Sequence, residues 1–397
     1  MSEMSYLEKL LDGAEVEWKP LREVCDFKNG FAFKSNLFKE TGLPIVRITN
    51  IDGFNVNLDE VKYFSPNDYK EDVSSFEVSM GDIVIAMSGA TTGKVGFYKN
   101  ETRCYLNQRV GKFVPKRNLL NNKYLYHFLL LNTEAIYILA GGGAQPNLSS
   151  NALMSKLLIP IPSSSNPEKS LAIQSEIVRI LDKFTALTAE LTAELTAELT
   201  MRKKQYNYYR DQLLSFDEGE VEWKTLGEIT RKIASGRNKT RQAEGDFPVY
   251  GSTGLLGFTN EPAYSGDLLL VARVGAYAGL VNAVSGHFDV SDNTLIIHPS
   301  DSWNSRFAFH QLTHMNLNQY AVGAGQPLIT GGMLKNLKVP VPSLNEQTRI
   351  AKILDKFETI TVSITEGLPR EIELRQKQYE YYRDLLFSFP KPEIASY

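Results

Sequence analysis

A run of apolar residues at helical spacing predicts one long helix in the middle of the chain. These residues recur at intervals of three and four, as one face of an amphipathic helix requires. They are Ile177, Ile180, Leu181, Phe184, Leu187, Leu191, Leu195 and Leu199. Asn166 and Pro167 supply an N-cap followed by proline at the first helical position. If it continues to Phe216, the helix is about 50 residues or roughly 75 Å long, which is too long for one globular core and calls for a partner helix.

A second long helix is predicted towards the C-terminus. It opens with Ser343-Leu-Asn-Glu346, the pattern of a capping box. Apolar residues then keep the helical spacing: Ile350, Ile353, Leu354, Phe357 and Ile360. Gly367-Leu-Pro369 is expected to kink or break this helix, because proline removes a backbone donor.

Four segments of the chain occur twice. EVEWKPLREV (15–24) returns as EVEWKTLGEI (220–229), and RKKQYNYYRDQLLSF (202–216) returns as RQKQYEYYRDLLFSF (375–389). ILDKF occurs at 180–184 and 353–357, and GAQPNLSSNALMSKLLIPIP (143–162) returns loosely as AGQPLITGGMLKNLKVPVP (324–342). The two ILDKF copies lie 173 residues apart, as do the two KQY copies. The chain is therefore an internal duplication, whose two long helices are expected to pack antiparallel about a pseudo-twofold axis.

The stretches between the duplicated segments have a different pattern. Residues 19–160 and 224–340 are rich in Gly, β-branched and aromatic residues, and short apolar runs such as GLPIVRI, GDIVIAM and GDLLLVA predict strands. Helices are expected in these stretches only at places such as 124–131 and 306–312. Trp18 and Pro160 are 142 residues apart and Trp223 and Pro340 are 117 apart, so two heads of one plan differ in length.

The predicted fold class is α/β in the mixed α+β sense: two β-rich domains joined by two long antiparallel helices. The predicted boundaries are 1–162 for the first β-rich domain and 163–217 for the central helix. The second β-rich domain is expected at 218–342 and the C-terminal helix at 343–397.

Composition narrows the class of protein. The chain of 397 residues is 43% hydrophobic and 22% charged, as in an ordinary globular protein, and no apolar run is long enough to span a membrane. Its net charge of −3 argues against binding nucleic acid by bulk attraction. Cys25 and Cys104 are too few for a disulfide framework and fit a reducing cytoplasm as buried small hydrophobes.

No motif predicts a catalytic centre or a metal site. GATTGKV (89–95) has three residues between its glycines instead of four, and Val95 stands where a phosphate loop needs Ser or Thr. A glycine-rich turn after a strand is the better interpretation. His310 and His314 have helical spacing, but no HExxH motif surrounds them and no cysteine pair lies near.

Basic residues gather in one stretch of each head. Seven basic residues and one acid lie between Lys94 and Arg117, and five basic residues and no acid lie between Arg231 and Arg241. Lys and Arg bind phosphate, while Arg, Asn and Gln pair with purine edges. A solvated charged face explains either stretch alone. Two such stretches, one per head, make nucleic-acid binding an equal alternative.

Together these features resemble the specificity (S) subunit of type I restriction-modification systems. The resemblance covers essentially the whole chain. It is carried by the duplicated KQYxYYRD segments, the PxPxxxxQ-type entries to the long helices and the run TAELTAELTAEL (188–199). IVRITNIDG (45–53), GDIVIAMSGATTGKVG (81–96) and LNQRV (106–110) also look like this family's target-recognition domains. The second head matches less well, since VSDNT (290–294) replaces LNQ.

The resemblance implies a non-catalytic protein that recognises double-stranded DNA in the cytoplasm. Each target-recognition domain would read one half of an asymmetric bipartite site, and the helices would fix the gap. It also implies docking of two methyltransferase (M) subunits, with endonuclease (R) subunits joining that M2S core. No cofactor is expected in this chain; S-adenosylmethionine, ATP and Mg²⁺ are expected in the partner subunits.

Candidate DNA-contacting residues follow from residue type and a loop-like setting. In the first head they are Lys28, Asn29, Lys34, Arg47, Asn50, Gln108 and Arg109. In the second head they are Arg237, Asn238, Lys239, Arg241 and Arg273.

The identical TAEL blocks suggest a helix whose length is adjusted in whole blocks. One block adds about 6 Å and a net rotation of about 40° to a helix, while one base pair advances roughly 3.4 Å and turns about 34–36°. The block count is therefore expected to set the gap between half-sites.

Two alternative functions of the chain stay open: a coiled-coil scaffold whose heads bind proteins, and an enzyme in its own right.

Overall fold

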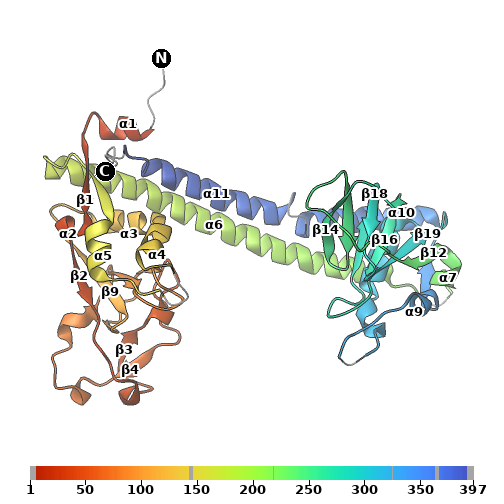
Figure 1. Cartoon of the computed structure of the whole chain (residues 1–397), viewed down its shortest axis with the longest axis horizontal. Helices are drawn as coiled ribbons and strands as arrows, with labels where there is room; N and C mark the ends of the chain where they lie inside the picture. The colour runs from red at the N-terminus through yellow and green to blue at the C-terminus, as the bar shows by residue number, and fades with distance from the viewer. Residues whose placement is uncertain (1–5, 143–145, 218, 324, 363–365, 391–397) are drawn as a thin grey trace. The chain divides into compact units, whose positions relative to one another are not determined.

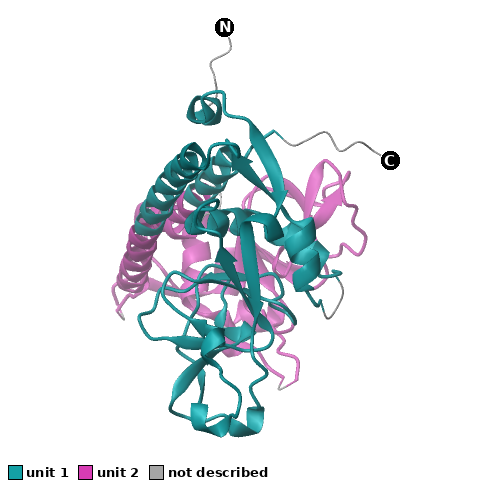
Figure 2. Ribbon diagram, turned by 90° about the vertical axis from the view of Figure 1, so that its left-hand side faces the viewer, with its two compact units in different colours: residues 1–191, 375–397 teal, residues 192–374 magenta. Residues whose placement is uncertain are grey.

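The computed structural model describes residues 6–142, 146–217, 219–323, 325–362 and 366–390. The chain forms two compact units (Figure 2): unit 1 contains residues 1–191 and 375–397, and unit 2 contains residues 192–374. Each unit thus combines one β-rich head with parts of the long helices, whereas the sequence suggested separate head and helix domains. The difference arises because the apolar helix faces complete the head cores. The opening residues of the GAQP and AGQP repeats, 143–145 and 324, lie outside the described residues.

Head 1 (residues 6–162) contains two four-stranded sheets and a separate strand pair. One sheet has the order β2 (Cys25–Asn29), β9 (Val110–Pro115), β6 (Ile83–Ala86), β7 (Val95–Phe97). The other has the order β4 (Lys62–Phe64), β3 (Leu43–Val46), β8 (Cys104–Leu106), β5 (Glu77–Val78), with β3 and β8 parallel. The strand pair joins β1 (Val16–Pro20) to β10 (Leu158–Pro162). The helices of head 1 are α1 (Tyr6–Leu11), α2 (Leu21–Val24), α3 (Asn122–Leu131), α4 (Thr133–Leu139) and α5 (Ser150–Lys156). Head 1 also has 3₁₀ turns at Ser35–Leu37, Ile48–Asn50, Pro66–Asp68 and Ser74–Phe76.

Head 2 (residues 219–342) has the same strand order in both sheets. One sheet runs β12 (Thr230–Ser235), β19 (Thr294–Pro299), β16 (Leu268–Ala272), β17 (Val281–Val284). The other runs β14 (Gly254–Thr259), β13 (Phe247–Gly251), β18 (His287–Val290), β15 (Tyr264–Ser265), with β13 and β18 parallel. β11 (Glu222–Thr225) pairs with β20 (Lys338–Val341). Its helices are α7 (Leu226–Ile229), α8 (Ser305–His314) and α9 (Gly331–Lys335), with a 3₁₀ turn at Leu317–Tyr320.

The shared topology confirms that the heads have one plan, although their sequences match poorly. Their length difference lies mainly in one place: residues 47–82 separate β3 from β6, whereas residues 252–267 separate β13 from β16. The predicted strands GDIVIAM and GDLLLVA are β6 and β16, which are buried along their whole length at the centre of each head. The predicted helices at 124–131 and 306–312 are α3 and α8.

The central helix is continuous, as its periodicity predicts. α6 (Pro167–Leu214) has 48 residues, and the Asn166 side chain accepts a hydrogen bond from the Lys169 backbone N–H at 3.1 Å. The C-terminal segment forms two helices, α10 (Leu344–Thr361) and α11 (Leu368–Leu386), interrupted where Gly367 and Pro369 predict a break. None of the described helices is long and apolar enough to cross a membrane.

α6 and α11 run side by side in unit 1 (Figure 1), and their contacts show that they are antiparallel. The Phe184 ring of α6 stacks on the Tyr382 ring of α11 with centroids 4.9 Å apart. The Thr185 hydroxyl donates a hydrogen bond to the Tyr379 hydroxyl at 3.2 Å. In unit 2, Tyr209 of α6 stacks in the same way on Phe357 of α10, at 5.6 Å. In both units, the KQYxYYRD segment of one copy therefore packs against the ILDKF segment of the other copy.

Each head is joined to its helices by a buried glutamine. In unit 1, Gln174 of α6 accepts a hydrogen bond from the Asn121 N–H at 2.8 Å and donates to the Leu119 carbonyl at 3.0 Å. In unit 2, Gln347 of α10 accepts from the Asn304 N–H at 2.8 Å and donates to the Ser302 carbonyl at 3.0 Å. Both glutamines are 0% exposed. Because Asn121 and Asn304 cap α3 and α8, each glutamine fixes the start of a head helix.

Each unit also has a histidine–aspartate pair that joins the head helix to the long helix. His127 Nε2 is 3.1 Å from Asp182 in unit 1, and His310 Nε2 is 2.7 Å from Asp355 in unit 2. Burial lowers the pKa of both histidines, although the neighbouring carboxylates oppose this shift. The Nδ1 atom of each imidazole is buried without a hydrogen-bond partner. We therefore assign both as neutral rings that donate from Nε2.

The cysteines are buried, as predicted. Cys25 and Cys104 are free thiols with exposures of 1% and 0%. Burial raises the pKa of each to about 12, so both thiols stay protonated and pack as small apolar groups.

We predict that the folded chain loses stability as the pH falls from 7.5 to 5.5. The unfolded chain protonates His127 and His310 near pH 6.5, whereas the folded chain holds their pKa lower, so acid favours unfolding across this window. The charges of Lys123 and Arg383 lower the pKa of His127 further, and the charge of Arg306 lowers the pKa of His310 further. The Glu358 carboxylate opposes the lowering of the His310 pKa. Thermal unfolding at several pH values measures the effect.

The double variant His127→Gln/His310→Gln, whose amides can still donate to the aspartates, should show a shallower dependence of Tm on pH. The slope should not vanish, because burial also lowers the pKa of His298 and His314. His287→Gln, at an exposed position, is the matched control and should leave the slope unchanged. An equal slope in the double variant and the wild type would contradict the assignment.

Candidate nucleic-acid interface

Three loops of head 1 meet around one short turn, residues 107–109, which we call the central turn of head 1. The Asn107 N–H donates to the Val46 carbonyl at 3.0 Å, and the Met87 N–H donates to the Arg109 carbonyl at 2.8 Å. The Phe31 N–H donates to the Leu106 carbonyl at 2.9 Å, immediately before the turn. The loops that follow β2, β3, β6 and β8 therefore form one connected face, held by the backbone.

Head 2 repeats this arrangement around residues 291–293, the central turn of head 2. The Ser291 N–H donates to the Tyr250 carbonyl at 2.9 Å, and the Arg273 N–H donates to the Asn293 carbonyl at 3.0 Å. The Arg237 N–H donates to the Val290 carbonyl at 3.0 Å. LNQRV (106–110) and VSDNT (290–294) thus occupy equivalent positions, and their different side chains stand on the same backbone.

A glycine crosses directly beneath each central turn. A Cβ atom at Gly30 would lie 2.0 Å from the Asn107 carbonyl oxygen, and one at Gly236 would lie 2.2 Å from the Ser291 carbonyl oxygen. Because both nearest atoms are backbone, neither position has room for a side chain. These glycines allow the loop after β2 or β12 to pack against the turn.

In head 1, the structure brings Gln108, Arg109, Arg47 and Asn29 to the loop face. Gln108 and Arg109 are exposed on the central turn, and Asn29 ends β2 beside Gly30. Arg47 follows β3; its side chain is half-buried, and its Nε atom has no partner among the described residues.

Two predicted residues lie near the edge of the head 1 face. Lys28 is exposed, and its Nζ donates to the Ser75 carbonyl at 3.4 Å. Lys34 is also exposed, and its backbone N–H donates to the Tyr69 hydroxyl at 3.1 Å. Both cations are accessible, but neither residue itself bonds to the central turn.

Asn50 does not fit its predicted role in DNA contact. Its side chain is 5% exposed, accepts a hydrogen bond from the Arg47 N–H at 3.0 Å, and donates to the Asn57 carbonyl at 3.1 Å. A further bond to the Glu60 carbonyl at 3.4 Å uses the remaining amide hydrogen. Asn50 therefore holds the loop after β3 together, and its amide is not available to a base.

In head 2, Arg237, Lys239 and Arg241 are exposed. Lys239 and Arg241 line a hollow of about 400 Å³ beside the central turn. Asn238 is partly used inside the head, because its Nδ2 donates to the buried Asp289 carboxylate at 2.6 Å.

Arg273 also reaches the head 2 face. It follows β16 in the chain and is half-buried, and its Nε has no partner among the described residues. Its backbone N–H donates to the Asn293 carbonyl and its carbonyl accepts from the Ile329 N–H, so it lies between the central turn and Ile329.

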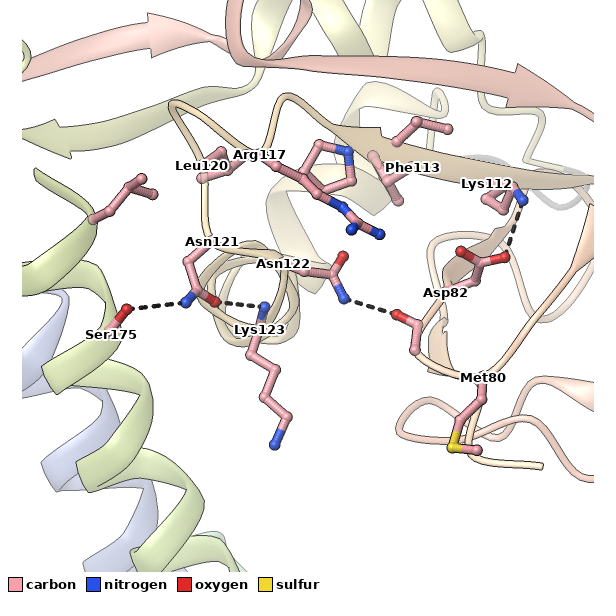
Figure 3. Close-up of a pocket in the computed structure, with 14 residues that line it drawn as sticks. Met80, Asp82, Lys112, Phe113, Arg117, Leu120, Asn121, Asn122, Lys123 and Ser175 are labelled. Atoms are coloured by element: carbon pink, nitrogen blue, oxygen red, sulfur yellow. Dashed lines mark hydrogen bonds and ion pairs between the residues drawn. The ribbon is translucent and has the colours of Figure 1, made fainter. Parts of the chain in front are cut away.

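The basic run from Lys94 to Arg117 serves partly internal roles. Lys112 Nζ pairs with Asp82 at 2.9 Å, and exposed Arg103 pairs with Glu77 at 3.4 Å. Figure 3 shows Lys112, Asp82 and Arg117 around a hollow of about 510 Å³ between the strands of head 1 and α6. Asn121 closes this hollow on the α6 side through Ser175 at 3.2 Å. The hollow belongs to the junction of head and helix rather than to the loop face.

One group of possible metal ligands exists among the described residues. Atoms of His310, Asp355 and Glu358 lie within 4.8 Å of one another. The Arg306 guanidinium already bonds Asp355 at 2.7 Å and also pairs with Glu358. The positively charged Arg306 guanidinium therefore occupies the position that a metal ion would take between these ligands.

The segment GATTGKV (89–95) forms a turn between β6 and β7 rather than a phosphate loop. The buried Thr92 hydroxyl donates to the Gly89 carbonyl in this turn at 2.6 Å.

Comparison with known proteins places this geometry in a family. Residues 14–201 and 218–374 match the type I restriction modification DNA specificity domain. The chain is 40% identical to the type I restriction enzyme EcoR124I/EcoR124II specificity subunit of Escherichia coli, covering 100% of both chains. It is 42% identical to the EcoprrI specificity subunit of Escherichia coli, covering 92% of this chain and 93% of that one.

The chain belongs to the specificity subunits of type I restriction-modification systems. Its fold is also that of the S subunit from M. genitalium, with a TM-score of 0.54 at 20% identity over 98% of this chain and 100% of that chain. The HsdS subunit from Thermoanaerobacter tengcongensis gives a TM-score of 0.54 at 17% identity, covering 94% and 96% of the two chains.

Some residues of this specificity subunit's loop face were missed from the sequence. Asp292 and Asn293 take the places of Gln108 and Arg109. Asp292 is acidic, so its residue type does not mark it as a DNA contact. Gly30 and Gly236 precede Phe31 and Arg237 at matching places, yet the surrounding sequences differ too much to align. The backbone bonds reveal both correspondences.

Proposed function

We propose that each head of this specificity subunit reads one half of an asymmetric, bipartite site in double-stranded DNA. The observation that carries this is the equivalent loop face in both heads, on which the central turns present different side chains. Arg, Asn and Gln can pair with base edges, and neighbouring Lys and Arg can hold phosphates. Equal backbones with unequal side chains suit two half-sites of different sequence.

We infer that the chain has no catalytic activity and works with partner subunits in the cytoplasm. Two methyltransferase subunits would dock on the helices, and endonuclease subunits would join the resulting core. S-adenosylmethionine, ATP and Mg²⁺ would be bound by those partners. The net charge of −3 supports this division, because the partners would supply part of the DNA-binding surface.

Two equivalent tyrosines support the docking of two like partners. Tyr208 of α6 and Tyr381 of α11 occupy equivalent positions of the duplicated KQYxYYRD segments and are 62% and 63% exposed. Each contacts the next ring edge-on, Tyr209 at 5.4 Å and Tyr382 at 5.5 Å. Exposed tyrosines held in place at duplicated positions suit a partner surface, where aromatic residues are enriched.

The proposed function is tested by co-expressing the chain with a methylating subunit and mapping methyladenine at base resolution across the host genome. We expect a bipartite motif with a fixed gap, which disappears when the chain is omitted. A stable complex that leaves the genome without such a motif would favour the alternative of a protein-binding scaffold.

We predict that deleting one TAEL block, residues 192–195, shifts the gap between half-sites by about one base pair. The deletion shortens α6 by about 6 Å and removes a net rotation of about 40°, which approximates the twist of one base-pair step. The same methyladenine map reads the gap, and both half-sites should keep their sequences. Thr192→Ser/Thr196→Ser keeps the helix length and should keep the gap. An unchanged gap between the half-sites in the deletion variant would contradict the prediction.

We predict that Tyr208→Asp and Tyr381→Asp each remove one methyltransferase subunit from the complex, and that the double variant removes both. A buried carboxylate without a partner is costly at an interface. Native mass spectrometry of the co-purified complex gives the stoichiometry. Tyr137→Asp changes a 39% exposed tyrosine on α4 and should leave the complex intact. Full occupancy in the double variant would show that the docking surface lies elsewhere.

A further inference from the structure

The two central turns differ in charge at one equivalent position. The Gly30 N–H donates to the Val110 carbonyl at 3.0 Å, and the Gly236 N–H donates to the Thr294 carbonyl at 2.9 Å, so the turns end in register. Asp292 therefore stands where head 1 has Gln108. An acidic side chain takes the place of an amide on a face proposed to meet DNA.

The structure holds Asp292 in a defined setting. Inside the turn, the Thr294 N–H donates to the Ser291 carbonyl at 3.2 Å, and the Ser252 hydroxyl donates to the Asn293 carbonyl at 2.8 Å. Asp292 is exposed and lines the hollow of about 400 Å³ together with Lys239 and Arg241. No ion pair joins Asp292 to a basic residue in the part of the chain that the structure describes, so its carboxylate oxygens remain available.

The chemistry of a carboxylate limits what Asp292 can contact on DNA. An ionised carboxylate only accepts hydrogen bonds, and it is repelled by the phosphates that Lys239 and Arg241 would attract. In the major groove, hydrogen-bond donors are the exocyclic amino groups of adenine N6 and cytosine N4. A carboxylate facing those atoms gains a hydrogen bond, whereas one facing the acceptors of guanine or thymine does not.

We propose that Asp292 is a specificity-determining residue of head 2. Its carboxylate accepts a hydrogen bond from the exocyclic amino group of an adenine or cytosine, while Lys239 and Arg241 hold the adjoining phosphates. This inference rests on the proposed function and adds to it the base on the strand that Asp292 faces, which must be adenine or cytosine at that position of the half-site. Gln108, at the matching position of head 1, both donates and accepts and imposes a different requirement.

Asp292→Ala tests the inference in the complex of the full chain with the methylating subunit. Methyladenine mapping should show one motif position becoming degenerate, with methylation at the original sites reduced about tenfold or more. The other half-site and the gap should not change. Asp246→Ala is the matched control, because Asp246 is exposed at the opposite end of β13 from the loop face; it should preserve the whole motif.

Asp292→Asn keeps the shape of the side chain and one acceptor but adds a donor. It should therefore admit bases with acceptors at the same motif position, and it decides the question if Asp292→Ala does not assemble with the methylating subunit. Wild-type motifs and rates in the assembled variants would overturn the role of Asp292 and leave the proposed function standing. A wild-type chain that directs no bipartite methylation would instead overturn the proposed function itself.

Discussion

The buried amide of one glutamine per unit fixes where each head meets the helices. Gln174 and Gln347 are 173 residues apart in the sequence, are fully buried, and make the same bonds to the residues before and at the cap of a head helix. A buried amide that loses its partners costs about 1–3 kcal/mol, so these bonds define the orientation of α3 and α8 against α6 and α10. The loop faces are in turn built on sheets that pack against those helices.

The duplication is interlocked rather than simply repeated. Tyr382 stacks on Phe184 in unit 1 and Tyr209 on Phe357 in unit 2, so each unit contains segments from both copies. Aromatic pairs of this kind add about 0.5–1.5 kcal/mol beyond their buried area. Each head consequently depends on helix residues that are distant in sequence. A substitution in the helical repeat of one copy therefore also affects the head of the other copy.

The frame could be predicted from the sequence, because periodicity and repetition are local signals. The register of α6, its Asn166 cap and the break at Gly367 all follow from short patterns. The loop face could only partly be predicted. Gln108 and Arg109 are exposed as their residue types suggested, but Asn50 is buried by bonds to Asn57 and Glu60 that no spacing rule reveals. The equivalence of the two central turns depends on backbone pairing between distant strands, which is invisible when the side chains differ.

We infer that the same backbone frame in both heads presents two different base-reading surfaces. The most direct measurement places a photoreactive residue at Gln108 or at Asp292 in the complex with the methylating subunit and maps the crosslinked nucleotide. We expect crosslinks to bases in opposite halves of the bipartite motif, one half for each position, and none from Asp246. Crosslinks to partner protein alone, or to the same half-site from both positions, would contradict this inference.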